Sequence, residues 1–204
     1  MTGRVHLGDM EVEVFDGVYP PSEDTLLLMD AVQGQCRGRA LELCAGTGAV
    51  GLSIADRVDS VVAVDLNPLA VRNTVINYRV NGAGGKPDAV AGDLFSPIGE
   101  QEFDIILMNP PYLPEQGEAE DIAWSGGAEG RQVIDRFIME VGRFLAPCGR
   151  AFFLQSTLNG VEESLDALRH QELGAKIVLT ADFQFEGLVV IEVSHSALQK
   201  TKIL

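Results

Sequence analysis

The chain has 204 residues, of which 46% are hydrophobic and 22% are charged, and its 15 basic and 30 acidic residues give a formal net charge of -15. This length fits one domain, and no run of 18 apolar residues offers a membrane-spanning helix. The negative charge argues against a protein that grips a long stretch of nucleic acid, because phosphate neutralisation dominates such binding. Enhanced solubility, a high-salt habitat and a basic protein partner all remain open as reasons for the charge.

The beginning of the chain and its cysteines indicate a cellular compartment. The first residues have neither the apolar core nor the cleavage site of a signal peptide. Cys36, Cys44 and Cys148 are an odd number of cysteines and lack the spacing of metal ligands. We therefore expect reduced thiols, a cytoplasmic protein and no metal site.

The N-terminal residues are predicted to form a hairpin followed by a helix. Residues 4–15 alternate between apolar and polar side chains around a Gly8-Asp9 turn. Ser22 then precedes an apolar helical pattern, and its hydroxyl can accept an orphan N–H group at a helix start. We expect a single domain, in which residues 1–33 form a hairpin and a lid helix and residues 34–204 form the core.

From residue 39 onward, apolar runs alternate with helical segments. Strands are predicted at 40–44, 60–65, 88–93, 103–109, 150–156, 175–183 and 188–195, and helices at 48–58, 68–82, 130–145 and 160–172. This alternation predicts a doubly wound, mostly parallel α/β sheet of seven strands. No helix separates the last two strands, so the final strand is expected to be antiparallel. Ligands bind at the carboxyl ends of such strands, which selects the loops after Cys44, Asp65, Asp93 and Asn109.

A glycine-rich loop follows the first of these strands. Gly46, Gly48 and Gly51 spell G-x-G-x-x-G, which suits a tight turn, a close approach of backbone to ligand, and close helix packing, respectively. Asp65 ends the next strand, where both NAD sites and S-adenosylmethionine sites place a carboxylate for the ribose. The loop and Asp65 together indicate an adenosine cofactor without choosing between these two. A tight turn with no ligand is the alternative.

Two further features separate the candidate cofactors. Glu42 lies inside the first strand, where a carboxylate suits a positive sulfonium and ammonium but not a pyrophosphate. Asp93 follows the third strand and can accept the adenine amino group, while Leu94 can donate its backbone N–H to the adenine ring. An ordinary turn or helix cap is the alternative for Asp93.

The motif Asn109-Pro110-Pro111-Tyr112 follows the strand at 103–109. Two prolines stop strand pairing and lock the backbone in an extended form. The side-chain oxygen of Asn109 and the carbonyl of Pro110 are then expected to face one spot, beside the ring of Tyr112. Two such acceptors suit a planar amino group that attacks an electrophilic methyl group, which predicts S-adenosylmethionine as the cofactor. The alternative is a proline strand stop beside a core tyrosine.

Together these motifs resemble the class I methyltransferases that modify planar amino nitrogens. The stretches at 17–32 and 122–137 resemble the short eukaryotic and archaeal-type branch of the HemK family, and the likeness extends from about residue 11 to 193. Members of that family methylate the glutamine amide of the Gly-Gly-Gln motif in translation release factors. The resemblance implies a Rossmann-like fold and S-adenosylmethionine as cofactor. The NPPY motif alone is shared with adenine-N6 DNA methyltransferases.

The resemblance also implies the roles of individual residues. Those expected to hold the cofactor, from its methionine part to its adenine, are Thr25, Glu42, Gly46, Gly48, Asp65, Asp93, Leu94 and Asn109. Those expected to hold the glutamine amide are Asn109, Pro110, Pro111, Tyr112, Tyr19 and Glu23, among which Asn109, Pro110 and Tyr112 are the catalytic candidates. A first-turn acidic pair that favours the helix dipole is the alternative for Glu23 and Asp24. Trp124 is interpreted as a loop anchor, with substrate access as the alternative.

The expected function is therefore protein methylation at a release-factor glutamine. The alternatives are a protein lysine, the N6 amine of adenine or the N2 amine of guanine in nucleic acid, an NAD-dependent dehydrogenase, and a silent partner subunit. The negative charge and the lack of a spare domain for base flipping argue against nucleic acid, and NPPY with Glu42 argues against NAD. The resembled branch implies a small zinc-containing activator protein that pairs with the sheet edge.

Overall fold

The fold is described from a computed structural model, for residues 3–34, 36–83, 85, 87–112, 130–183 and 186–196. The main sheet has the strands β3 (Arg39–Leu43), β4 (Ser60–Asp65), β5 (Asp88–Ala91), β6 (Phe103–Met108), β7 (Leu145–Ser156), β8 (Leu173–Asp182) and β9 (Gly187–His195). The helices are α1 (Glu23–Val32), α2 (Ala49–Ser53), α3 (Pro68–Val80), α4 (Gln132–Phe144), α5 (Val161–His170) and the short 3-10 helix η1 (Thr157–Asn159). A separate hairpin contains β1 (Gly3–Leu7) and β2 (Met10–Val14).

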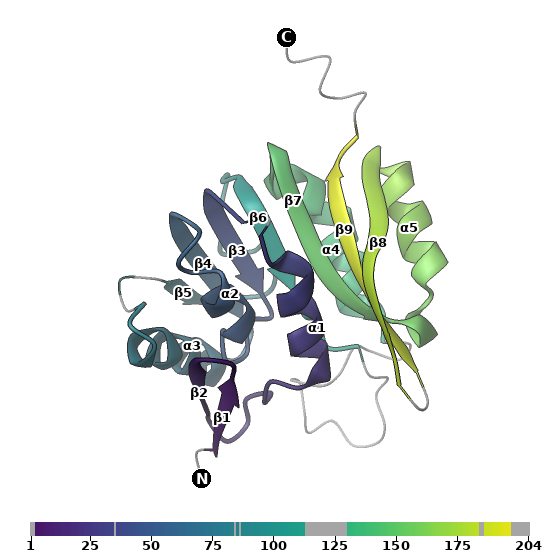
Figure 1. Cartoon of the computed structure of the whole chain (residues 1–204). Helices are drawn as coiled ribbons and strands as arrows, with labels where there is room; N and C mark the ends of the chain where they lie inside the picture. Colours follow the sequence, from purple (N-terminus) through teal and green to yellow (C-terminus); the bar gives the residue numbers. More distant parts are fainter. Residues whose placement is uncertain are drawn as a thin grey trace.

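The seven strands lie in the order β5-β4-β3-β6-β7-β9-β8 (Figure 1). Neighbouring strands from β5 to β7 are parallel, whereas β9 runs antiparallel to both β7 and β8. This arrangement confirms the predicted doubly wound sheet with an antiparallel last strand. The order reverses between β3 and β6, so the carboxyl ends of these two strands border the position where such sheets bind ligands.

Helices cover both faces of the sheet, with α1 in front and α4 and α5 behind in the view of Figure 1. The alternation of side chains along β6 explains the two cores. Ile105 and Leu107 join the cluster that contains Leu28 of α1, and Ile106 and Met108 join the cluster that contains Phe137 of α4. Since β6 is apolar on both faces, it can only be a central strand of a covered sheet.

The predicted elements exist, although some boundaries differ. The helix expected at 48–58 ends at Ser53, and the chain continues in turns with i to i+3 hydrogen bonds such as Ala55 N–H to Leu52 C=O, 3.1 Å. Ile54 and Val58 are nevertheless buried, so turns bury the apolar side chains from which a longer helix is predicted. β7 begins at Leu145, directly after α4, with a register irregularity opposite Phe103 and Ile105.

The hairpin and the beginning of α1 lie at the edge of the sheet where the parallel strands end (Figure 1). The hairpin pairs Leu7 with Met10, which confirms the predicted turn at Gly8-Asp9. Ser22 is the N-cap of α1, as predicted. None of the described helices is long and apolar enough to cross a membrane.

Candidate active site

The glycine loop joins β3 to α2. Gly46 and Gly48 have φ angles of +55° and +76°, which glycine adopts without strain. A Cβ atom on Gly48 would lie 2.6 Å from Thr74 of α3, and one on Gly51 would lie 2.4 Å from Glu42 Oε2. A Cβ on Gly46 would meet only Tyr19, at 3.9 Å, so the loop has open space on this side. An adenosine cofactor fits this arrangement, because the loop can approach a ligand closely at Gly46.

Asp65 lies at the carboxyl end of β4, beside the glycine loop. Its Oδ2 accepts the Gly46 N–H at 2.7 Å, and its Oδ1 accepts the Asn67 N–H at 2.8 Å. Burial raises the pKa of Asp65, and the two N–H bonds oppose that rise. Each carboxylate oxygen keeps acceptor capacity after its backbone bond, so ribose hydroxyls remain compatible with this geometry.

Asp93 and Leu94 follow β5 at the same edge. Leu94 is buried and has a φ angle of +47°, which is a costly backbone conformation for a leucine. Such strained conformations are common at ligand sites. Asp93 Oδ2 receives a hydrogen bond of 2.8 Å from Nη2 of Arg136, and both side chains are about half exposed. Arg136 could not be predicted as a partner of Asp93, because it lies on α4, far from Asp93 along the chain.

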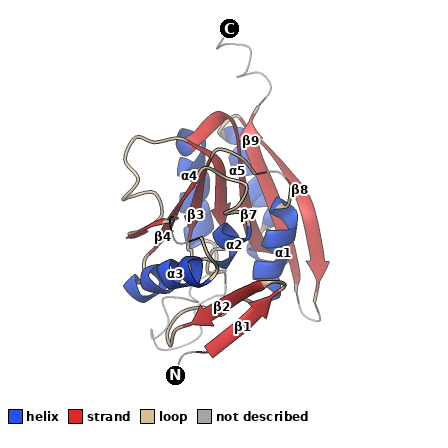
Figure 2. Ribbon diagram, turned by 60° about the vertical axis from the view of Figure 1, so that its left-hand side comes forward, coloured by secondary structure: helices blue, strands red, loops and turns tan. Residues whose placement is uncertain are grey.

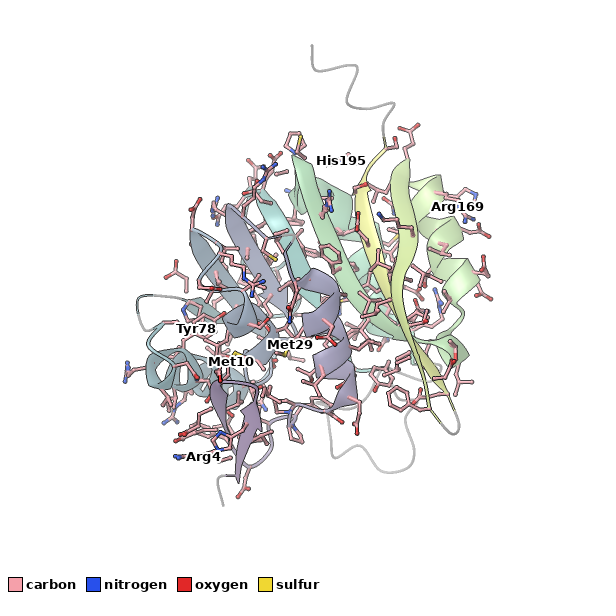
Figure 3. The ribbon with its side chains drawn as sticks, viewed as in Figure 1. Arg4, Met10, Met29, Tyr78, Arg169 and His195 are labelled. Atoms are coloured by element: carbon pink, nitrogen blue, oxygen red, sulfur yellow. The ribbon has the colours of Figure 1, made fainter. Side chains whose placement is uncertain are left out.

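Glu42 lies beneath the beginning of α2. Its side chain is 3% exposed and accepts backbone N–H groups of Gly51 and Val50. Burial raises its pKa to about 8, against these hydrogen bonds. Among the described residues, neither Glu42 Oε2 nor the hydroxyl of nearby Tyr78 has a hydrogen-bond partner. Figure 3 shows Tyr78 on α3, on the side of the sheet that carries α2. Contact between Glu42 and the methionine part of a cofactor remains a prediction.

The buried carboxylate of Asp24 joins the beginning of α1 to the NPPY motif. Its Oδ2 receives the Tyr19 hydroxyl at 2.7 Å and Nδ2 of Asn109 at 3.1 Å, and the Tyr112 hydroxyl oxygen lies 3.5 Å away. Thr25 Oγ1 bonds the other oxygen at 3.1 Å. Burial is the main cause that raises the pKa of both Tyr19 and Tyr112, and the negative charge of Asp24 is the second. Both hydroxyls therefore stay protonated.

Asn109 is held in one orientation by this carboxylate. Since Asp24 accepts from Nδ2, the amide of Asn109 must present Oδ1 on its other side. That oxygen is buried and has no partner among the described residues. A buried acceptor without a partner costs free energy, so it marks a position where a ligand donor can bind.

Of the other predicted site residues, some lie close to Asp24 and Asn109 and others do not. Thr25 is buried near Asp24, whereas Glu23 is exposed and bonded to the Ser22 hydroxyl. Asp24 rather than Glu23 therefore reaches Asn109. The sequence held a signal for this, because Asp24 shares a helix face with Leu28 and Val32 at intervals of four residues. Trp124 lies outside the described residues.

The fold and the site together define a class I S-adenosylmethionine-dependent methyltransferase. The family model of the methyltransferase small domain matches residues 21–176. The chain is 32% identical over 195 residues to a putative protein N5-glutamine methyltransferase of Methanocaldococcus jannaschii, covering 92% of this chain and 96% of that protein. It is 31% identical over 198 residues to the human methyltransferase HEMK2, covering 89% and 92%.

A solved structure agrees with these relatives. The Mtq2-Trm112 complex of E. cuniculi, described as responsible for methylation of the eRF1 translation termination factor, matches with a TM-score of 0.69 and 28% identity, over 88% of this chain and 99% of that one. The chain belongs to the HemK family of methyltransferases. It is an N-methyltransferase that uses S-adenosylmethionine.

Proposed function

We propose that this enzyme methylates the side-chain amide of the glutamine in the Gly-Gly-Gln motif of a translation release factor. The observation that carries the proposal is the buried, unpartnered Oδ1 of Asn109. A glutamine amide has two N–H groups and can donate one of them to this oxygen. The name of the archaeal relative, a protein N5-glutamine methyltransferase, supports a glutamine amide as the acceptor, and the Mtq2-Trm112 complex, described as methylating a translation termination factor, supports a release factor as the substrate.

The chemistry required of the site is modest. When bound, S-adenosylmethionine supplies an electrophilic methyl group. An amide nitrogen is a poor nucleophile because its lone pair is shared with the carbonyl. Asn109 Oδ1 and the Pro110 carbonyl can accept the two N–H groups and hold the nitrogen in line, which lowers the barrier through orientation and fixed dipoles. No strong base is needed before transfer: the methyl–sulfur bond would break as the nitrogen–carbon bond forms, S-adenosylhomocysteine would leave, and the nitrogen would then release one proton to water.

The remaining residues divide between cofactor and substrate. We propose that Gly46, Gly48, Asp65, Asp93 and Leu94 hold the nucleoside part of the cofactor, since all lie at the carboxyl ends of β3, β4 and β5. Thr25 and Glu42 are proposed for its methionine part. Pro111, Tyr112 and Tyr19 are proposed for the walls of the substrate site, in a single domain that includes the N-terminal hairpin and α1.

We also propose that a small activator subunit takes part, because Mtq2 was solved in complex with Trm112. The expected zinc would belong to that partner. Within the described residues of this chain, no group of three or more His, Cys, Asp or Glu side chains could hold a metal ion.

The test is methyl transfer from labelled S-adenosylmethionine to a purified release factor, with and without a Trm112-like subunit. The matched control is the same factor with its Gly-Gly-Gln glutamine replaced by alanine. We expect labelling of the native factor only, at N5 of that glutamine by mass spectrometry. Equal labelling of both factors, or stronger labelling of a lysine peptide or a DNA duplex in parallel reactions, would contradict the proposal.

A further inference from the structure

Three buried or half-buried asparagines, two on α3 and the third at its C-cap, join that helix to the hairpin. Asn73, Asn77 and Asn81 are four residues apart and therefore lie on one side of the helix. Figure 2 shows β2 beside α3, and Figure 3 places Met10, the first residue of β2, near this helix. Their amides bond the main chain of Phe15, Glu13 and Glu11, one after another along the extended segment.

The pairing resembles that of a neighbouring strand. Oδ1 of Asn77 accepts the Glu13 N–H at 2.8 Å and its Nδ2 donates to the Glu13 carbonyl at 2.9 Å; Asn81 does the same with Glu11, at 3.0 and 2.7 Å. An asparagine offers one acceptor and two donors, which match the groups of one strand residue. Four helical residues rise about 6.0 Å and two strand residues about 6.8 Å, a mismatch small enough for side chains to absorb.

Asn77 also reaches the glycine loop. The second N–H of its amide donates to the carbonyl of Thr47 at 2.9 Å. The side chain is fully buried, and its one acceptor and two donors are all in use. Within the described residues, the hydrogen bonds of Asn73 and Asn81 go only to the hairpin segment and to α3.

A second contact from α3 acts on the same loop. Thr74 Oγ1 lies 3.2 Å from the carbonyl oxygen of Gly46 and donates to it. The carbonyls of Gly46 and Thr47 are thus both turned toward α3. Because a peptide is planar and trans, the next N–H group in each case points away from α3. Contacts from one helix therefore fix the orientation of two consecutive peptides in the loop.

The segment after β2 continues over this loop. The Gly17 carbonyl accepts Nδ2 of Asn67, the N-cap of α3, at 2.8 Å. The Tyr19 carbonyl then lies 3.9 Å from the position of a Cβ on Gly46. Helix α3 therefore connects the hairpin and the segment before Tyr19 to the glycine loop.

We propose that Asn77 is a positioning residue for the cofactor loop, which makes the seated hairpin part of the S-adenosylmethionine site. The hairpin holds the Asn77 amide, and the amide holds the peptide between Thr47 and Gly48. This proposal rests on the cofactor and not on the identity of the methyl acceptor. It is therefore tested by cofactor binding alone.

The test compares Asn77→Asp with Asn81→Asp in the full chain. Both changes keep the shape of the side chain and remove its N–H donors, but only the first affects Thr47. We expect the Kd for S-adenosylmethionine, measured by calorimetry, to rise at least about tenfold for N77D and at most about threefold for N81D. At saturating cofactor, the rate of methyl transfer should stay within about threefold of wild type for N77D, because Asn109 and Asp24 are untouched.

A buried carboxylate could unfold the first variant, so Asn77→Ala provides the second measurement. It removes both donor bonds, and with them the acceptor of the Glu13 N–H, without introducing a charge, and circular dichroism checks that it is folded. N77A should also bind the cofactor at least about tenfold more weakly than N81A. If the Kd rises equally in the two alanine variants, or in neither, the three asparagines only fasten the hairpin to α3 and the proposal is wrong.

Discussion

Asn109 and Asp24 face each other between the NPPY motif and α1, with Nδ2 of Asn109 3.1 Å from Oδ2 of Asp24. The same carboxylate oxygen receives the Tyr19 hydroxyl at 2.7 Å. A carboxylate only accepts hydrogen bonds, so it dictates which end of the asparagine amide it binds. Asn109 Oδ1, the proposed acceptor for the substrate amide, is therefore oriented by Asp24, a residue from a different element of the fold.

Replacement of Asp24 by Asn should remove that control. An asparagine there can donate to Asn109 and allow its amide to flip, which would point Nδ2 toward the substrate. We expect methyl transfer in single-turnover assays to fall by roughly 10²-fold, the scale seen when one oriented polar group is lost. Asp30→Asn, an exposed change on the same helix, is the matched control and should have little effect. A D24N enzyme with the wild-type rate would show that Asn109 is oriented by other contacts.

Asn109→Ala deletes the acceptor itself. The glycine loop, Asp65 and Asp93 are left in place, so cofactor affinity should change by less than about tenfold. Methyl transfer at saturating cofactor should fall by roughly 10²-fold or more. Asn109→Asp should also be poor, since it cannot donate to Asp24 and places two carboxylates together. Near-normal transfer by N109A would mean that Asn109 only ends the strand and that the amide-binding interpretation is mistaken.

The sequence predicted the architecture well because the signals for it are local. β6 is apolar at every buried position, and Pro68 and Ser22 mark helix starts through ordinary capping chemistry. The strand order and the early end of α2 could not be predicted. They depend on how segments distant in sequence pack together, and turns can bury Ile54 and Val58 as well as a helix can.

The site residues that follow strands could be predicted from the sequence, whereas those that lie on helices were harder to predict. Gly46, Asp65 and Asn109 follow apolar runs, so their position at one edge follows from the fold class. Asp24 and Asn77 instead lie on helices, and their partners are far away in sequence. The spacing of Asn73, Asn77 and Asn81 was visible, but nothing local indicates that an extended segment from the N-terminus binds there.

Asp65→Ala tests the cofactor site at β4. The change removes the proposed ribose contacts and the two backbone bonds to Gly46 and Asn67. We expect a loss of about 1.5–3 kcal/mol in cofactor binding, roughly 10- to 150-fold in Kd. Thermal stability without cofactor should also fall, because two N–H groups lose their acceptor. Asp59→Ala, at the opposite end of the same strand region, is the control. Unchanged calorimetric affinity in D65A would remove Asp65 from the site.

Glu42 should make the stability of the fold depend on pH. Its pKa is raised by burial from 4.5 to about 8 in the folded chain, and unfolding returns it to its ordinary value. Between these two pH values the folded state holds a proton that the unfolded state has released. The free energy of unfolding therefore decreases as the pH rises through this window, by about 3–5 kcal/mol in total from this group.

Glu42→Gln should abolish this contribution, because an amide oxygen can still accept the N–H groups of Val50 and Gly51 and carries no charge. The variant should match wild type near pH 4.5 and become progressively more stable than it up to about pH 8, where the difference levels off. Other titrating groups affect both proteins alike, so urea unfolding at a series of pH values isolates the difference. Glu102→Gln, an exposed change, is the control and should give a curve parallel to wild type. Parallel curves for E42Q and wild type would show that Glu42 is ionised in the folded enzyme across this range.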